Sequence, residues 1–301
     1  MKQRPVLIIL AVALGMGVLF FLVLFLASLV SGGRSAKGIT PLSGMDRVAL
    51  VKIEGVLITA DDTVTEINAY ADEASIKAII IRIDSPGGGV VASQEIYNAV
   101  LNARKAGKKV VISMGSVAAS GGYYVAAAGD RIVANPGTLT GSIGVKMEFA
   151  NLEKLLEKIG VKGMVVKAGE YKDMGSPFRE MSAEEHRLLQ AVIDDVHSQF
   201  IEAVAKGRNL PETEVRTIAD GRIFTGRQAL QLKLVDQLGD LDDSIQTAAE
   251  LAGIKGKPNV IRKERKFPLL EYFKEETASW LSEVVARSLG TGLMRLEFLY
   301  P

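Results

Sequence analysis

Ser120 lies in a stretch of small side chains that ends in two tyrosines, written AASGGYY (residues 118–124). Small neighbours allow another piece of backbone to approach the hydroxyl closely. Serine is a weak nucleophile and needs a general base that takes its proton. The same composition also suits tight packing of a helix against a sheet, so a purely structural explanation of this stretch stays open beside the catalytic one.

A histidine is not a convincing base for Ser120. The chain has only two, His186 and His197, and both fall on one predicted helix. They share a face about 16 Å apart, too far to hold one metal ion, and we expect both to be solvated. No Gly-x-Ser-x-Gly element is present, because residue 118 is alanine. The sequence therefore argues against an α/β-hydrolase triad.

Lys172, in GEYKDMGSP (residues 169–177), is the lysine whose surroundings differ from those of the others. Several lysines here directly follow or precede another Lys, a Glu or an Arg, whereas Lys172 falls between a predicted strand and a capped helix. A lysine accepts a proton only as the neutral amine, so a catalytic lysine needs a pKa lowered by burial. An exposed loop lysine is the alternative, and Asp173, if close, would favour the charged form.

Two glycine-containing turns complete the candidate chemistry. The first, DSPGGG (residues 84–89), falls between a predicted strand and a predicted helix. Backbone N–H groups in such a loop can hold a phosphate or a developing oxyanion, although a plain turn would need the same glycines. It matches neither a Walker motif nor Gly-x-Gly-x-x-Gly. The second turn, TGSIG (residues 140–144), adds the hydroxyl of Ser142.

Alternating strands and helices are expected to position these residues. Strands are predicted over residues 47–53, 78–84, 109–114, 131–134, 142–146 and 161–167, and helices over 64–74, 91–106, 122–128 and 151–159. This alternation predicts an α/β fold with largely parallel strands. Ligands bind at the carboxyl ends of such strands. The glycine loop and Ser120 are therefore predicted to face one crevice.

Helices dominate the chain after residue 168. Ser182 and Glu185 have the spacing of a capping box, which predicts the start of a long amphipathic helix that ends near residue 207. Shorter helices are predicted over residues 211–219, 226–232, 240–252 and 268–289.

The first 46 residues predict a membrane anchor and a tether. Residues 6–30 carry no charge, and a helix of this length spans about 37 Å, enough to cross a bilayer. A cleaved signal peptide is the alternative, but its apolar region is usually shorter. Residues 31–46 are rich in Gly and Ser, which indicates a flexible linker. Three parts result: residues 1–30, 31–46, and a domain over 47–301 with a helical C-terminal extension.

The composition excludes several classes of function. The net charge is +1, from 36 basic and 35 acidic residues, so no global field attracts nucleic acid. The chain has no cysteine, which excludes disulfides, thiol catalysis and cysteine-ligated metals. We expect no metal site and no cofactor.

Four motifs together resemble one known family. DSPGGG, GSVAASGGYY, TGSIGV and GEYKDMGSP, in this order and spacing, resemble the short form of signal peptide peptidase A (SppA), a family of Ser-Lys serine peptidases in the ClpP/crotonase-like superfamily. The resemblance extends over residues 48–251. It implies an α/β fold built as a spiral of β-β-α units and preceded by one transmembrane helix.

The resemblance also implies residue roles. Ser120 matches the nucleophile, Lys172 the general base, and Ser142 the serine that orients the lysine amine. Gly87 and Gly88 match the oxyanion loop, and Gly121 is positioned to help. Whether Ser120 and Lys172 pair within one chain or between two chains stays open.

Substrates, partners and location follow from the same resemblance. The implied substrates are remnant signal peptides and other hydrophobic peptides. The implied assembly is a homo-oligomer, octameric in the known type, in which each site is shared by neighbours, and the apolar end GLMRLEFLYP could lie along a neighbour's groove. The implied location is the cell membrane, with residues 6–30 in lipid, the N-terminus in the cytoplasm and the catalytic domain on the extracytoplasmic side. The positive-inside rule leans weakly the same way.

Three alternatives are weighed against this interpretation. An NfeD-like membrane Ser-Lys protease would carry a C-terminal β-barrel module that this sequence lacks. A crotonase-type acyl-CoA enzyme usually works through acidic residues and needs no Ser-Lys pair. A non-catalytic membrane scaffold of the same fold is disfavoured by the intact Ser120, Lys172 and Ser142.

Overall fold

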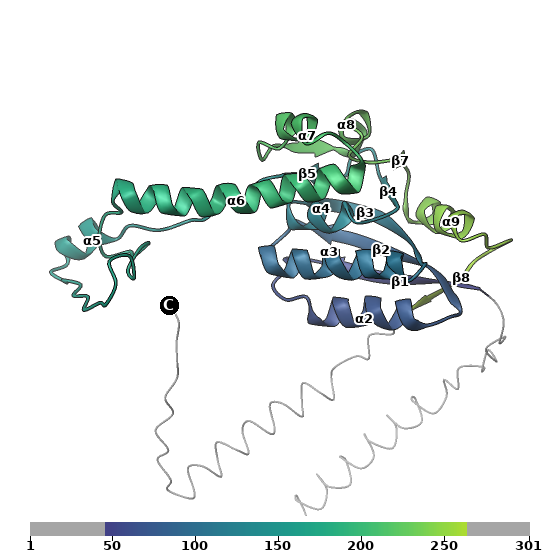
Figure 1. Cartoon of the computed structure of the whole chain (residues 1–301), viewed down its shortest axis with the longest axis horizontal. Coiled ribbons are helices and arrows are strands. Elements are labelled where there is room, and N and C mark those ends of the chain that lie inside the picture. Colours follow the sequence, from purple (N-terminus) through teal and green to yellow (C-terminus); the bar gives the residue numbers. More distant parts are fainter. Residues whose placement is uncertain (1–45, 264–301) are drawn as a thin grey trace, which may run out of the picture. The chain divides into compact units, whose positions relative to one another are not determined.

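An eight-stranded sheet lies at the centre of residues 46–263, the residues that the computed structural model describes (Figure 1). The strands run in the order β6-β5-β3-β2-β1-β8, and β4 pairs with β3 and with β7. Every pairing is parallel except that of β5 with β6. The bounds are β1 (Arg47–Glu54), β2 (Ile76–Ser85), β3 (Lys109–Ala119), β4 (Arg131–Ala134), β5 (Leu139–Gly141), β6 (Ile223–Thr225), β7 (Gln237–Leu238) and β8 (Asn259–Arg262). The predicted α/β class with largely parallel strands is confirmed.

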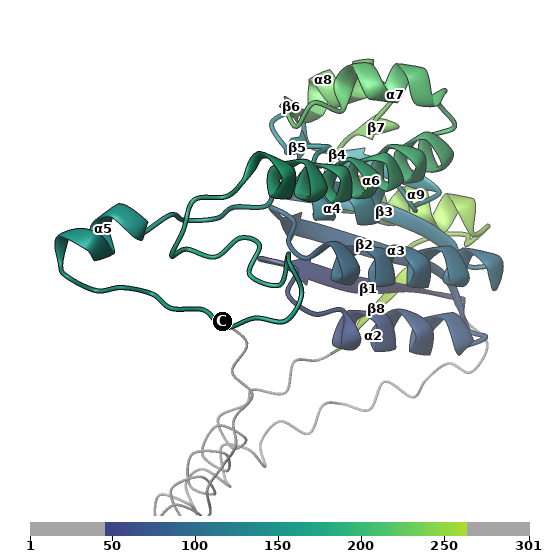
Figure 2. The ribbon, with the colours of Figure 1, turned by 60° about the vertical axis from the view of Figure 1, so that its left-hand side comes forward.

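Helices cover both faces of this sheet, as Figure 2 shows. Their bounds are α2 (Asp61–Asp72), α3 (Val90–Lys105), α4 (Gly121–Ala126), α5 (Glu153–Lys158), α6 (Ala183–Arg208), α7 (Glu212–Ile218), α8 (Gly226–Gln231) and α9 (Leu241–Leu251). Strand β2 illustrates the two layers. Ile79 and Ile81 belong to the larger core cluster, with residues of α2, α3, α4 and α6, whereas Ala78 and Ile80 belong to a smaller cluster with α9. Because strand side chains alternate between faces, a strand buried on both sides is a continuous apolar run.

Two strand predictions are wrong. Residues 142–146 form no strand, because β5 ends at Gly141 and the backbone turns at Ser142, whose φ is 51°. Residues 161–167 are β-branched in part, but no strand lies beside them to supply a ladder, so they stay irregular. The prediction also missed β6, β7 and β8, which have two to four residues each and carry little periodic signal.

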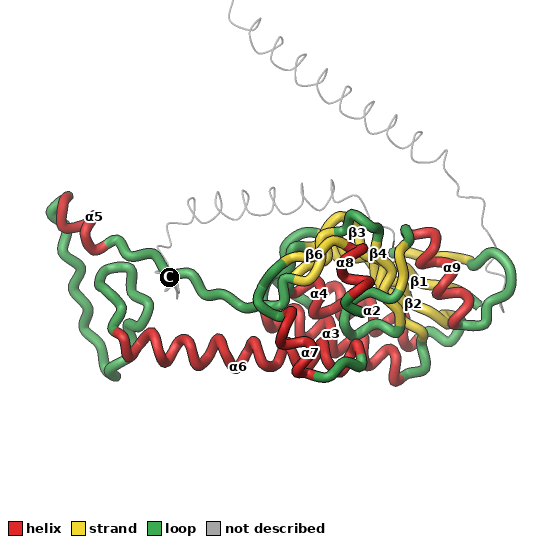
Figure 3. The backbone as a smooth tube through the Cα atoms, turned by 90° about the horizontal axis from the view of Figure 1, so that it is seen from above, coloured by secondary structure: helices red, strands yellow, loops and turns green. Residues whose placement is uncertain are grey.

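Residues 145–182, here called the arm, extend from the sheet and return to the start of α6 (Figure 3). All of these residues are described, and none is buried. The arm folds on itself: the Leu152 N–H donates to the Pro177 carbonyl at 2.8 Å, and the Phe149 ring packs against Gly175. Helix α6 follows, beginning with the predicted capping box of Ser182 and Glu185. Its last turns, from Phe200 onward, enter the core.

No helix among residues 46–263 combines the length and the apolar character that a membrane crossing requires. The predicted membrane span, most of the predicted linker, the predicted helix over 268–289 and the apolar tail lie outside the described residues.

Candidate active site

Ser120 occupies the turn between β3 and α4 in a strained backbone conformation, with φ 53° and ψ −122°. Four described residues other than glycine have positive φ, and two of them are Ser120 and Ser142. Such a conformation costs about 1–3 kcal/mol and persists only where the surrounding structure holds it. Both serines that the sequence singles out therefore stand at strained positions, which are common in active sites.

The small residues after Ser120 are required by close packing. A Cβ on Gly121 would lie 2.3 Å from the Ser93 Oγ, and one on Gly122 would lie 3.0 Å from the Ser85 carbonyl oxygen. Because Gly121 and Gly122 have no side chains, the glycine loop can lie directly beside Ser120. The structural explanation for AASGG is thus correct, and it places Ser120 at the cleft as well.

The glycine loop brings backbone N–H groups to the same place. A Cβ on Gly87 would lie 2.8 Å from the Ser120 Cβ and 2.7 Å from the Gly121 nitrogen. The Gly87 N–H already donates to the Ser85 Oγ at 3.1 Å. In the described part of the chain the Gly88 N–H has no acceptor. The Gly121 N–H belongs to the first turn of α4, where N–H groups have no intrahelical partner. Gly88 and Gly121, rather than Gly87, therefore offer backbone N–H groups that a ligand could accept from.

Strand pairing brings Ser142 to Ser120. Strand β5 lies beside the end of β3, with Ala119 opposite Gly141. The Ser120 N–H donates to the Gly141 carbonyl at 2.9 Å, and Ser142 is the next residue. The Ser142 N–H donates in turn to the Arg222 carbonyl at 2.8 Å, which fixes the turn.

These groups line one cavity of about 670 Å³, within the range of ligand sites. Ser120, Gly88, Gly121 and Ser142 all contribute to its wall. The apolar part of the wall comes from α3, α4, α6 and the start of the arm, namely Val90, Tyr124, Val145, Ile193, Val196 and Phe200. The Tyr124 ring meets those of Tyr97 and Phe200 at centroid distances of 5.1 and 5.0 Å, and burial raises the pKa of the Tyr124 hydroxyl.

Charged groups lie on the same wall. Lys146, the amine nearest in sequence to Ser142, lines the cavity, but its ammonium is bonded to Glu148 Oε1 at 2.8 Å and is largely exposed. Asp220 also lines the cavity, and hydrogen bonds from Arg222 hold its pKa at about 2. Within residues 46–263 no group of three His, Cys, Asp or Glu side chains is arranged to hold a metal ion.

His197 departs from its predicted solvated position. It is half-buried, it lines the cavity, and its Nε2 is buried without a hydrogen-bond partner in the described structure. His186 is exposed as predicted. Gln190, Ile193, Asp194 and His197 line the cavity together because the i, i+3, i+4, i+7 spacing puts them on one face of α6. This spacing is the sequence pattern from which their common position on one helix face could have been predicted.

Lys172 does not line this cavity. It is exposed on the arm, where its N–H donates to the Gly169 carbonyl at 3.3 Å. Figures 1 and 3 show the arm, with α5, beyond the N-terminal end of α6 and away from the sheet. One chain therefore brings together Ser120, Ser142, Gly88 and Gly121, but not Lys172.

Comparison with known proteins agrees with this geometry. The model of peptidase family S49 matches residues 102–255, more than half of the chain. The model of the Clp protease family matches residues 47–138, which hold β1 to β4. The described fold is thus a mixed α/β domain of the ClpP-like kind.

Three relatives illustrate the similarity. A protein of Synechocystis sp. with a provisional protease name is 48% identical over 69% of this chain and 75% of its own length. A provisionally named signal peptide peptidase SppA of Enterococcus faecium is 34% identical over 75% of this chain and 64% of its own length. Protease 4 of Haemophilus influenzae is 33% identical over 80% of this chain, which spans only 40% of that longer protein. Given these matches and a strained serine beside free N–H groups, the chain belongs to peptidase family S49 and is a serine protease.

Proposed function

We propose that this chain is a membrane-anchored endopeptidase in which Ser120 attacks the peptide and Lys172 of a neighbouring copy is the general base. The observation that carries the proposal is the cavity itself. It holds a strained serine, a second serine and two N–H groups, yet the candidate base of the same chain lies elsewhere. A lysine from a second chain would complete the site.

The exposed apolar side chains of the arm support a partner at this place. Eleven large apolar residues on the arm are exposed, far more than a free surface segment of this length needs: Met147, Phe149, Leu152, Leu155, Ile159, Val161, Met164, Val165, Val166, Tyr171 and Phe178. Ion pairs and hydrogen bonds order the arm in a definite shape despite this exposure. A second copy that covers these residues would bury them and bring Lys172 to a cavity.

The reaction would proceed through an acyl-enzyme. The neutral Lys172 amine takes the Ser120 proton as Oγ attacks the peptide carbonyl, and Ser142 orients the amine. The Gly88 and Gly121 N–H groups stabilise the oxyanion. Collapse breaks the C–N bond, and the Lys172 ammonium gives its proton to the leaving amine. The same amine then deprotonates a water molecule, which hydrolyses the ester and returns the proton to Ser120.

Hydrophobic peptides suit the apolar wall of the cavity. Val90, Ile193 and Val196 contribute aliphatic surface to the cavity. Tyr124 and Phe200 offer flat aromatic surfaces. We propose remnant signal peptides and similar apolar peptides as substrates. The uncharged residues 6–30 would anchor the chain, with the N-terminus in the cytoplasm and the catalytic domain outside it. Release of the chain from membranes by an alkaline wash without detergent would contradict the anchor.

The first test compares three variants of the full chain, purified in detergent, on an aliphatic peptide substrate. Ser120→Ala and Lys172→Ala should each lower kcat by at least about a thousandfold, since each removes half of the nucleophile–base pair. Lys146→Ala separates the two candidate lysines. Its turnover should stay within about twofold of wild type if Lys172 is the base, whereas loss of turnover in Lys146→Ala with retention in Lys172→Ala would reverse the assignment.

A further inference from the structure

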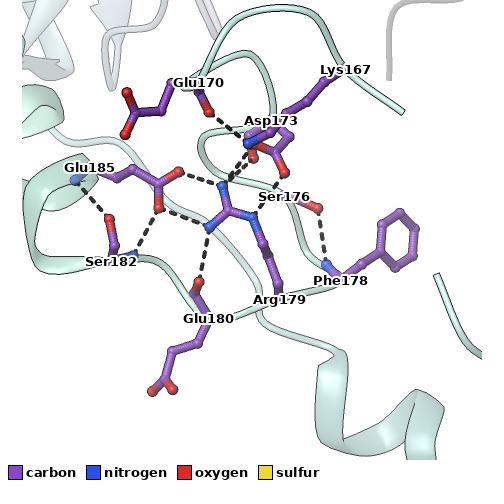
Figure 4. Close-up of polar contacts among 9 residues, drawn as sticks. All are labelled: Lys167, Glu170, Asp173, Ser176, Phe178, Arg179, Glu180, Ser182 and Glu185. Atoms are coloured by element: carbon purple, nitrogen blue, oxygen red, sulfur yellow. Dashed lines mark hydrogen bonds and ion pairs between the residues drawn. The ribbon is translucent and has the colours of Figure 1, made fainter. Parts of the chain in front are cut away.

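A cluster of ion pairs surrounds the guanidinium of Arg179, next to the segment that carries Lys172 (Figure 4). Arg179 Nε donates to Asp173 Oδ2 at 2.9 Å, and Nη2 donates to Asp173 Oδ1 at 2.9 Å. On its other side Nη1 donates to Glu185 Oε2 at 2.9 Å, and Nη2 also contacts Glu185 Oε1. A planar fork of five donors can satisfy two carboxylates in this way, whereas a lysine cannot.

The cluster joins three pieces of backbone. Glu185 is the N3 residue of the α6 capping box, and its carboxylate also accepts from the Ser182 N–H at 2.8 Å. Lys167 Nζ donates to the Glu170 carbonyl at 2.6 Å and to the Asp173 carboxylate. Arg179 therefore ties the loop just after Lys172 to the first turn of α6, and Lys167 joins the residues before Lys172 to the same carboxylate of Asp173. The Glu185 side chain is buried and that of Asp173 is only 13% exposed, although the arm itself contains no buried residue.

The cluster also neutralises the carboxylate that follows Lys172 in sequence. Two cations, Lys167 and Arg179, face two carboxylates, Asp173 and Glu185. The hydrogen bonds of Arg179 hold the pKa of Glu185 at about 2, and those of Arg179 and Lys167 hold the pKa of Asp173 well below its usual value. Asp173 is thus a carboxylate whose charge is already taken up.

We propose that Arg179 is a positioning residue for the general base: it fixes the Lys172 segment on α6 and occupies the Asp173 carboxylate, which would otherwise pair with the Lys172 ammonium. The inference rests on the proposed function of Lys172. A free carboxylate beside a lysine favours the charged amine, which cannot accept the Ser120 proton. The charged side chains that adjoin this segment are Lys167, Glu170, Asp173, Arg179, Glu180 and Glu185.

The experiment measures kcat and KM of the full chain on the aliphatic peptide across the alkaline range. In Arg179→Gln we expect kcat to fall by about tenfold to a hundredfold, the cost of a misplaced catalytic group. The alkaline rise of kcat should move up by about one pH unit, because Asp173 then keeps only Lys167 as a partner and its carboxylate stabilises the Lys172 ammonium more strongly. KM should stay within about twofold of wild type, since Arg179 does not line the cavity.

A double variant separates the effect of the Asp173 charge from the effect of Arg179 on the position of Lys172. Arg179→Gln with Asp173→Asn also removes the Asp173 carboxylate, so the alkaline rise should return towards its wild-type pH while kcat stays low. Arg104→Gln is the matched control, because Arg104 makes a comparable ion pair with Asp130 at 2.8 Å and does not line the cavity. It should lower the thermal midpoint without moving the pH profile.

If Arg179→Gln yields no folded protein, Arg179→Lys carries the test. It keeps a cation and loses the fork, so kcat should fall while the alkaline rise stays in place. A wild-type pH profile and kcat in the variant that folds would overturn the inference. Lys172→Ala, measured beside them, distinguishes the two claims. If it retains turnover, the proposed function fails; if it is inactive while the Arg179 variant equals wild type, only the role of Arg179 fails.

Discussion

At Ser120 the chain holds a side chain in a backbone conformation that glycine adopts more easily. Ser120→Gly should therefore stabilise the fold by about 1 kcal/mol relative to Ser120→Ala, since relief of strain exceeds the extra entropy of glycine in the unfolded chain. Denaturant unfolding of the two variants measures this difference.

Ser116 offers the control for that comparison. It is exposed on the same strand, β3, and its φ is negative. Ser116→Gly should be less stable than Ser116→Ala by about 0.5–1 kcal/mol. Equal signs at the two positions would mean that the Ser120 backbone is unstrained.

The positions of close backbone contact could be predicted from the sequence where glycines mark them. The glycines at 87, 88 and 121 mark close approaches, and the structure gives each a physical reason. Arg179 was not predictable, because a charged residue in a polar loop has the same sequence signal whether it is solvated or holds two carboxylates. Its contacts depend on how the arm folds, which no periodicity describes.

Among the elements, helix α6 begins beside the exposed arm and ends in the core. Its capping box and length were predicted correctly, since both are local in sequence. The irregular structure over residues 161–167 was not, because strand formation needs a neighbouring strand that only the tertiary fold can supply. The last turns of α6 pack on the core, and there Gly207 allows the helix to approach the residue that follows α4.

Gly207 provides the test of that packing. A Cβ on Gly207 would lie 1.9 Å from the Ala127 carbonyl oxygen, which follows α4. Gly207→Ala should destabilise the fold by about 3 kcal/mol, since the backbone cannot move aside cheaply. Gly137→Ala is the matched control, because nothing lies within 4 Å of its added Cβ, and it should change the unfolding free energy by less than about 0.5 kcal/mol. A similar, small effect at both positions would show that α6 can shift without cost.

At the scale of the whole molecule, the candidate base Lys172 lies outside the cavity that Ser120 lines. A pattern in one chain cannot show whether a second chain supplies the base. Sequence patterns describe what one chain folds into, whereas a shared site depends on how copies meet. The structure adds two observations: the arm exposes many apolar side chains, and Lys172 does not line the cavity of its own chain.

Subunit mixing tests this separation directly. Ser120→Ala and Lys172→Ala chains are each inactive under the proposal. When the two are co-expressed at equal levels, about a quarter of the sites in a head-to-tail ring would combine an intact Ser120 with an intact neighbouring Lys172. Turnover should therefore recover to about a quarter of wild type. No recovery is expected if both residues act within one chain.

A second mixture guards against errors in expression level. Wild-type chains co-expressed with the Ser120→Ala, Lys172→Ala double variant should give about a quarter of full turnover if sites are shared, but about half if each chain carries its own site. Shared sites thus predict equal activity in the two mixtures, whereas separate sites predict none in the first and half in the second. Because both mixtures contain the same number of intact serines and lysines, only their distribution between chains differs. The ratio of the two activities therefore decides whether the lysine on the arm serves its own serine or that of the next copy.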